Sequence, residues 1–299
     1  MPRKTGAACP VVEPQLQRRA SLALFIGASI WGLYWLPLRE LARMGIDGAW
    51  GVALFNACPL LVLVPLLIWK RRAAFVHLGP SLFIGIASGA ALGLYSTSMV
   101  MAPVIRMTME FYLTSVWSTI IGVIWLAERL NLRRGLAVVA GLLGLFLLLS
   151  GASDLATSAL GLGDVFAVLS GMLWAVGAAG LKRWPDTHVL TTSAIQFLFA
   201  VLTGAALALS VLSISSPNAA QIVAALPLAF ICSSLLLLPS VLAIFWACRI
   251  LFPGRAAILM MSEALVATIS ASLLLPAETM TALQWSGGLI VLLACIIGR

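Results

Sequence analysis

Two glutamate residues lie inside long apolar stretches of this chain, where a charge is costly. Glu110 lies about one helical turn into one stretch, and Glu263 about three turns into another. A carboxylate at a bilayer centre costs about 2.5 kcal/mol or more, so it serves a function or is paired. Glu263 is therefore either a site for a substrate ammonium group or a proton, or half of a structural pair. For Glu110 we favour a structural pair with Arg106, one turn away.

Aromatic residues in the same stretches provide a second kind of chemistry. A ring pair gains roughly 0.5–1.5 kcal/mol beyond area burial, and an ammonium group binds over the face of Trp or Tyr. Tyr95 and Tyr112 are the stronger candidates, because a buried hydroxyl group needs a hydrogen-bond partner. Trp31 and Trp174 occupy matching places in the two halves of the chain. The alternative for each ring is helix packing or lipid contact.

Uncharged polar residues add donors and acceptors to these stretches; they are Asn56, Ser96, Thr97, Ser98 and Gln196. Each belongs either to a binding site or to a hydrogen bond between helices. Together, these patterns predict a small-molecule site built from Trp31, Tyr95, Ser98, Tyr112, Trp174 and Glu263. Coupling or gating would fall to Glu263, Glu110 and Arg106.

The sequence offers no motif for catalysis, for a metal or for a cofactor. His77 and His188 both lie between apolar stretches, and the five cysteines show no paired spacing. No nucleotide-binding loop occurs, so ATP is not the direct energy source. We predict that the protein is not an enzyme, although a membrane-embedded enzyme stays an alternative. A channel is another, but no filter-like segment occurs.

Composition indicates the elements that hold these residues. Of 299 residues, 62% are hydrophobic and 9% are charged, with mean hydropathy +1.09, whereas soluble domains have about 25% charged residues. Spanning helices need about 20 apolar residues each. The predicted spans are 20–38, 48–69, 79–101, 107–127, 134–152, 160–181, 189–212, 222–248, 254–276 and 281–298. The fold class is therefore an all-α membrane protein with ten transmembrane helices.

The basic residues predict the orientation of these spans. With the N-terminus inside, 15 of the 18 Lys and Arg residues fall on the cytoplasmic side. The net charge of +8 thus reflects residues that flank spans, and we predict no nucleic-acid partner. Residues 1–19 should form a cytoplasmic tail, and both termini should be cytoplasmic. The expected partners are the lipid bilayer and the substrate; the sequence leaves the oligomeric state open.

An internal repeat divides the chain into two halves. Pro103 and Glu128 enclose one predicted helix, and Pro253 and Glu278 enclose another at the same spacing. The halves are residues 20–152 and 160–298, each with five predicted helices. Five is odd, so the second half would enter from the opposite side. Inverted repeats of this kind are associated with transporters that alternate access around a central site.

These residues resemble a known family. The stretch from Tyr95 to Pro103, Tyr112-Leu113-Thr114 and Leu126–Leu130 is similar to EamA-type drug/metabolite transporters, and Ser262-Glu263 and Pro276–Glu278 repeat the pattern. The resemblance is greatest to the bacterial aromatic amino acid exporters. It implies two inverted five-helix repeats around a central cavity, with predicted helices five and ten outside it.

The resemblance also implies an activity and a location. The implied activity is export of small metabolites, most of all aromatic or other neutral amino acids, across a bacterial inner membrane. Export of hydrophobic cations or drugs is the alternative. One departure concerns Thr114-Ser115 and Ala264-Leu265, which stand where many members have a proline. A milder helix break is expected at both places.

Overall fold

The computed structural model describes residues 13–46, 48–70, 76–101, 104–128, 132–150, 160–212, 215–274 and 280–297, and all regular structure in them is helical. The helices of the first half are α1 (Pro14–Trp31), α2 (Trp35–Arg43), α3 (Gly48–Trp69), α5 (Leu78–Met101), α6 (Val104–Tyr112), α7 (Thr114–Leu126) and α8 (Leu132–Leu149). Those of the second half are α9 (Leu162–Arg183), α10 (Val189–Ser210), α11 (Ala219–Cys232), η2 (Ser233–Leu237), α12 (Leu238–Ile250), α13 (Pro253–Met260), α14 (Ser262–Leu274) and α15 (Ala282–Ile297).

Eight of the helical segments are long and apolar enough to cross a membrane. They correspond to the predicted spans one to four and six to nine. Predicted spans five and ten appear as the shorter apolar helices Gly135–Leu149 and Ala282–Ile297. A helix of 16 residues is about 24 Å long, less than the roughly 30 Å of a hydrocarbon core. Ten crossings therefore stay a prediction, whereas a multi-pass helical membrane protein is what the structure shows.

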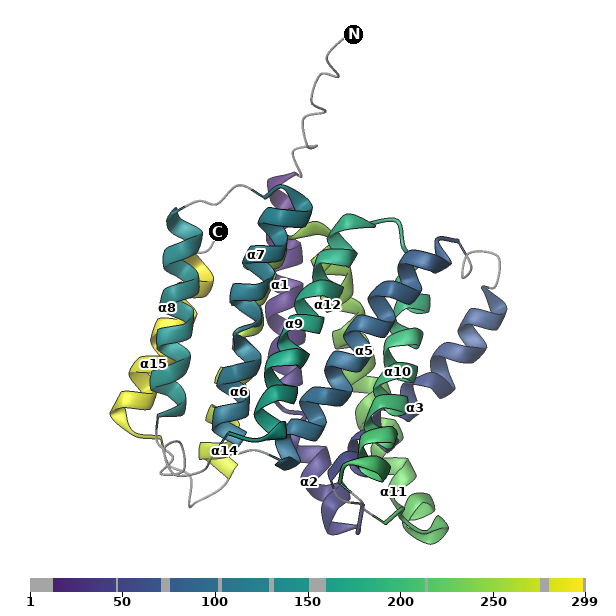
Figure 1. The fold of residues 1–299 in the computed structure, drawn as a ribbon. Helices are drawn as coiled ribbons and strands as arrows, with labels where there is room; N and C mark the ends of the chain where they lie inside the picture. The colour runs from purple at the N-terminus through teal and green to yellow at the C-terminus, as the bar shows by residue number, and fades with distance from the viewer. Residues whose placement is uncertain are drawn as a thin grey trace.

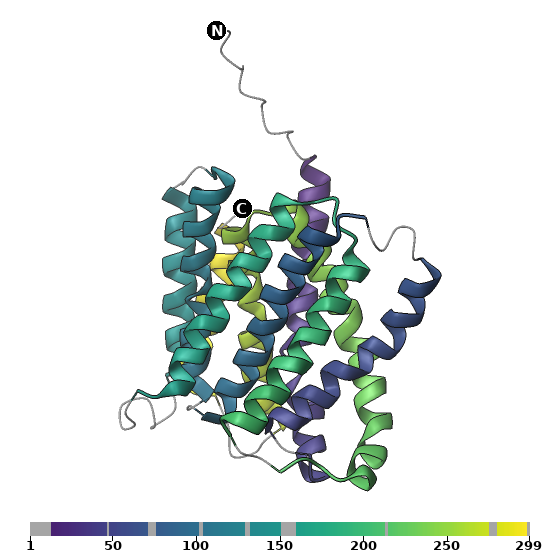
Figure 2. The ribbon, with the colours of Figure 1, turned by 45° about the vertical axis from the view of Figure 1, so that its right-hand side comes forward.

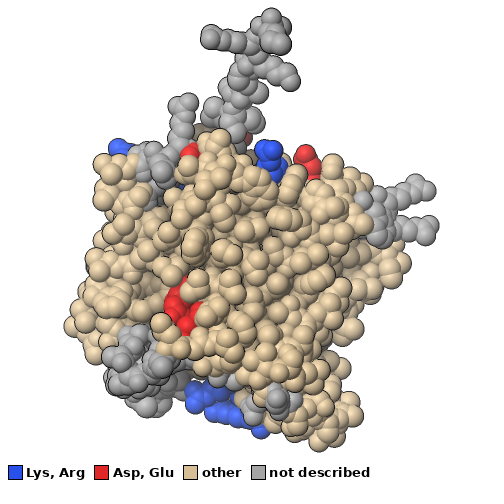
Figure 3. Space-filling model, viewed as in Figure 1, with Lys and Arg blue, Asp and Glu red and all other residues tan. Residues whose placement is uncertain are grey.

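The surface agrees with a membrane environment. Figure 3 shows a broad uncharged band, with most charged atoms at the two ends of the bundle. A small group of acidic atoms interrupts the band at mid-height (Figure 3). Large apolar side chains such as Ile124, Val139 and Leu273 are more than half exposed, as lipid-facing residues are expected to be.

The start of the first helix differs from the prediction. Helix α1 begins at Pro14, inside the stretch expected to be tail, because proline fits the first turn of a helix without losing a hydrogen bond. Helix α1 begins and α15 ends at the same end of the bundle (Figure 1). That arrangement is expected for an even number of crossings.

The helices form one bundle in which helices far apart in the sequence lie side by side (Figures 1 and 2). Helix α5 packs between α9 and α10, α3 packs on α10, and α1 packs on α12. Helices α8 and α15 pack on each other at one side of the bundle. Helices α5 and α9 belong to predicted spans three and six, the third span of the first half and the first span of the second. Helices α12 and α1 belong to predicted spans eight and one, the third span of the second half and the first span of the first. These matched contacts are what an internal repeat would produce.

A row of glycines brings two of these helices into close contact. Gly85, Gly89 and Gly93 lie on one face of α5 against α10. A Cβ atom at Gly89 would lie 2.5 Å from the carbonyl oxygen of Gln196. Small residues at an interface let helix backbones approach, and here they place the backbone of Gln196 directly beside α5.

Two spans are interrupted at their middle by a single residue. Leu113 separates α6 from α7 with φ −57° and ψ −12°, and Met261 separates α13 from α14 with φ −60° and ψ −14°. Each N–H donates to the carbonyl three residues back, Leu113 to Glu110 and Met261 to Ile258. These are tight 3₁₀-type turns. Both breaks are mild. The first lies directly before Thr114-Ser115, where the sequence predicts one, whereas the second precedes Ala264-Leu265, which lie within α14.

Two further spans change their helical form. The first span is interrupted between Trp31 and Trp35. The eighth contains the π-helix η2, which is followed by Pro239, a residue that lacks the N–H needed for a regular α-helical bond. Pro59 and Pro65 instead lie within α3 without ending it.

Candidate functional site

A cavity lies among the interrupted helices and contains about 470 Å³ of space, including its open side. Its lining residues are Trp31, Ala91, Leu92, Tyr95, Phe111, Trp174, Gln196, Val241, Ile244, Phe245, Met260 and Glu263. They come from both halves of the chain. The lining is mostly aromatic and aliphatic, and Glu263 is its one charged member.

Glu263 reaches the cavity from a break in its helix. It is the second residue of α14, directly after the turn at Met261, and its side chain is buried. The N-terminus of a helix carries partial positive charge and favours a carboxylate. The backbone of Gly32 packs against the carbonyl of Glu263, so closely that a side chain at Gly32 would not fit. The break and this contact fix where the carboxylate lies.

Two tyrosines surround the Glu263 carboxylate. The hydroxyl group of Tyr95 on α5 lies 3.5 Å from Glu263 Oε1, at the limit of a hydrogen bond. Tyr112, the last residue of α6, also lies close to this carboxylate. Its hydroxyl group donates to the carbonyl oxygen of Met260 at 3.3 Å. The carboxylate therefore has acceptor capacity left for a ligand that carries N–H or O–H groups.

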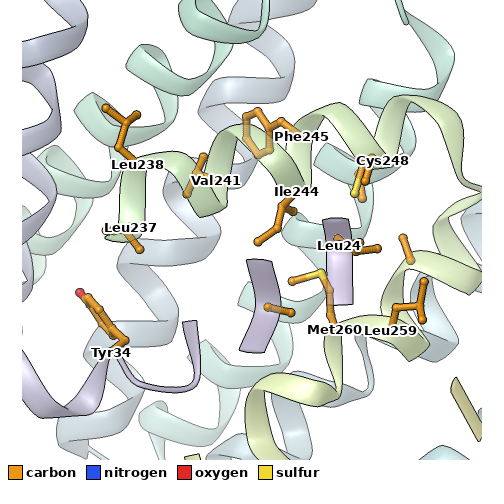
Figure 4. Packing of buried hydrophobic residues seen from close by; sticks show 14 of the residues in the cluster. Leu24, Tyr34, Leu237, Leu238, Val241, Ile244, Phe245, Cys248, Leu259 and Met260 are labelled. Carbon is orange, nitrogen blue, oxygen red and sulfur yellow. The ribbon is translucent and has the colours of Figure 1, made fainter. Parts of the chain in front are cut away.

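Aromatic rings form the walls of the cavity. The rings of Tyr95 and Phe111 lie 4.6 Å apart, and those of Trp174 and Phe245 lie 6.4 Å apart. Figure 4 shows Phe245 in a row with Val241 and Ile244 along α12, with Met260 nearby. Such walls suit a flat ring, and their faces also attract an ammonium group.

The structure brings together four of the six predicted substrate-binding residues. Trp31, Tyr95, Trp174 and Glu263 all line the cavity. Tyr112 is not a lining residue and lies behind the wall, with a side chain that is 1% exposed. Ser98 is also buried, and its hydroxyl group donates to the carbonyl of Tyr95 in its own helix at 2.7 Å.

Of the other two predicted coupling residues, the structure describes the side chain of Glu110 only. Glu110 is partly buried on α6 and does not line the cavity. The side chain of Arg106 lies outside the described residues, so its expected pairing with Glu110 stays a prediction. Among the described residues, no group of three His, Cys, Asp or Glu side chains is arranged to hold a metal ion.

Sequence reasoning missed the apolar part of the lining. Phe111 and Phe245 are two of 12 phenylalanines, and nothing in the sequence marks them. The sequence identifies Gln196 only as an uncharged polar residue in a span. An amide in an apolar stretch indicates a polar role, but the sequence does not show which helix the residue faces. The contact of its backbone with Gly89 on α5 decides this.

Comparison with known proteins adds a family to this geometry. The model of the EamA-like transporter family matches residues 18–150. The first half of the chain is EamA-like. A protein of known crystal structure aligns with TM-score 0.73 over 94% of this chain and 96% of its own, at 13% identity. That likeness concerns the fold alone. No curated protein matches.

The EamA-like match agrees with the helical membrane architecture. The family consists of membrane transporters, and the structure shows apolar helices around a central cavity. The resemblance seen in the sequence is therefore confirmed for the EamA-like half. Its finer part, the likeness to aromatic amino acid exporters, is not tested by this match.

Proposed function

We propose that this protein exports small metabolites that carry an aromatic or apolar group and an amine, with aromatic or other neutral amino acids as the main class. The observation that supports this most directly is the position of Glu263, a buried carboxylate in a cavity walled by Trp31, Tyr95 and Trp174. The carboxylate would bind the ammonium group, and the rings would cover the apolar part. The direction of transport follows from the family resemblance.

We further propose that transport proceeds by alternating access between two inverted repeats, residues 20–152 and 160–298. The matched breaks at Leu113 and Met261, with nearly equal dihedral angles, support the repeat. So do the matched contacts of α5 with α9 and of α1 with α12. Ten crossings in a bacterial inner membrane, with both termini cytoplasmic, complete the proposal.

Hydrophobic cations are a second candidate class of substrate. The lining of the cavity holds one acidic residue and no basic one. A hydrophobic cation carries no carboxylate, so the cavity would not need a basic residue to bind it. A zwitterionic amino acid would have to place its carboxylate against neutral donors, such as the hydroxyl group of Tyr95.

Transport into reconstituted vesicles tests the proposal. Vesicles that contain the full chain should accumulate labelled L-phenylalanine or L-tyrosine faster than empty vesicles, with saturable kinetics. Glu263→Gln, which keeps the shape and removes the charge, should slow this uptake at least tenfold. Matched vesicles with Glu40→Gln, an exposed acidic residue that pairs with Arg43 at the bundle end, should behave like the parent.

Three outcomes would count against a transporter that exports amino acids. Uptake no faster than in empty vesicles would refute it outright. Uptake of hydrophobic amines but of no amino acid would instead assign the cavity to the second class. Uptake that rises linearly with concentration would indicate a channel.

A further inference from the structure

Gln196 is the only uncharged amide side chain in the lining of the cavity. It lies on α10 and is 1% exposed. Its side-chain oxygen has no hydrogen-bond partner in the described part of the protein. Leaving a buried polar group unpaired costs about 1–3 kcal/mol. An amide in this state, in an aromatic and aliphatic cavity, is suited to a polar group that a ligand brings.

Gln196 and Glu263 lie at different levels of the cavity. The backbone carbonyl of Gln196 lies against Gly89 on α5, whereas the carboxylate of Glu263 lies near the hydroxyl of Tyr95 on the same helix. Six residues of α-helix separate Gly89 from Tyr95, a rise on the order of 9 Å. Between these levels Leu92 contributes to the wall. Gln196 and Glu263 thus contact α5 at levels offset by about the length of one substituted aromatic ring, and Leu92 lines the cavity between these levels.

We propose that Gln196 determines specificity within the proposed transport function by hydrogen bonding a polar substituent on the substrate ring, at the end remote from the amine. The amide can both donate to and accept from a phenolic hydroxyl group. The preferred substrates are therefore hydroxylated aromatic amines or amino acids. A ring that lacks the hydroxyl group leaves the amide unpaired, and sites that bind a substrate hydroxyl discriminate strongly against analogues without one.

The inference rests on the proposed function, and a pair of variants separates the two. Gln196→Met removes the amide and keeps an unbranched side chain of similar length. Asn56→Leu is the matched control, because Asn56 on α3 is also 1% exposed with an unpartnered side-chain oxygen but does not line the cavity. Both variants replace a buried amide with an apolar group, so losses from folding should be similar.

Unlabelled tyrosine and phenylalanine are compared as inhibitors of labelled L-tyrosine uptake. The decisive quantity is the ratio of their half-inhibitory concentrations. In the parent, phenylalanine should be at least tenfold weaker than tyrosine. In Gln196→Met the ratio should fall to about one, mainly because tyrosine weakens, and in Asn56→Leu it should stay at the parent value. The amines tyramine and phenethylamine, tested in the same way, should give the same pattern.

A parent that does not distinguish the two rings, or a ratio that Gln196→Met leaves unchanged, would overturn the assignment while amino acid transport stands. An equal change in Gln196→Met and Asn56→Leu would also overturn it, because the effect would then come from folding. A parent that transports neither amino acids nor amines would refute the proposed function itself, and the assignment with it.

Discussion

The hydroxyl group of Tyr112 donates a hydrogen bond to the carbonyl oxygen of Met260 at a distance of 3.3 Å. Tyr112 is the last residue of α6 and Met260 is the last residue of α13, so the bond joins the two interrupted spans at their breaks. Each half of the chain provides one partner. The breaks are therefore tied to each other directly behind the cavity wall.

Two further hydrogen bonds hold the breaks in matching ways. Thr114, the first residue of α7, donates to the carbonyl of Gly171 on α9 at 2.7 Å. Ser262, the first residue of α14, donates to the carbonyl of Phe25 on α1 at 3.1 Å. In both cases a hydroxyl group just after the break reaches the first helix of the other half. This likeness favours the internal repeat more specifically than composition does.

Removing these bonds should destabilise the bundle. Thr114→Val and Ser262→Ala should each lower the free energy of unfolding by about 1 kcal/mol, the usual net value of one hydrogen bond. The double variant should lose about the sum. Thr268→Val is the control, because Thr268 bonds within its own helix to Ala264. Denaturant unfolding in detergent measures all four; a control as damaging as the test variants would refute the role of the contacts between helices.

Tyr112 should matter for stability rather than for substrate affinity. Tyr112→Phe removes the bond to Met260 and keeps the ring, so we expect a loss of about 1 kcal/mol in unfolding. Its half-saturation concentration in uptake should stay within twofold of the parent, because Tyr112 does not line the cavity. Tyr95→Phe should change affinity more, since Tyr95 does. A larger effect on affinity from Tyr112→Phe would place Tyr112 in the binding site.

Gly171 should not tolerate a side chain. A Cβ atom there would lie 2.5 Å from the carbonyl oxygen of Phe111, at the break of span four. Gly171→Ala should therefore cost about 1–3 kcal/mol of stability, as overpacking does. Gly135→Ala offers the contrast, because no atom lies within 4 Å of its Cβ position. There alanine should raise stability by up to about 1 kcal/mol, and thermal unfolding of both variants checks the difference.

His188 should make stability depend on pH. It caps α10 outside the apolar span, and burial, together with Lys70 and Arg249, lowers the pKa of its imidazole below the usual value. The folded state then binds the proton less tightly than the unfolded state, so stability present at neutral pH is lost as the pH falls below about 6.5. His188→Gln should show a smaller fall in melting temperature between pH 8 and 5.5. An identical fall in the parent and the variant would contradict this.

The sequence by itself determined that this protein lies in a lipid bilayer and that it is helical. The bilayer acts on each segment separately, so run length and charge placement identify apolar helices without knowledge of their neighbours. The same logic marked Trp31, Tyr95, Trp174 and Glu263, because polar and aromatic groups are conspicuous in an apolar stretch. Spans five and ten were harder, since their helices are short.

Only the tertiary structure decided which faces of the helices meet. The side of α5 that carries Tyr95 faces the cavity, whereas the hydroxyl group of Ser98 one turn later donates to the backbone carbonyl of Tyr95. Phe245 and Gln196 entered the lining because of how α12 and α10 pack, which depends on contacts far apart in the sequence. Helix rotation and the positions of mild breaks arise from packing between helices, and a single segment carries no record of them.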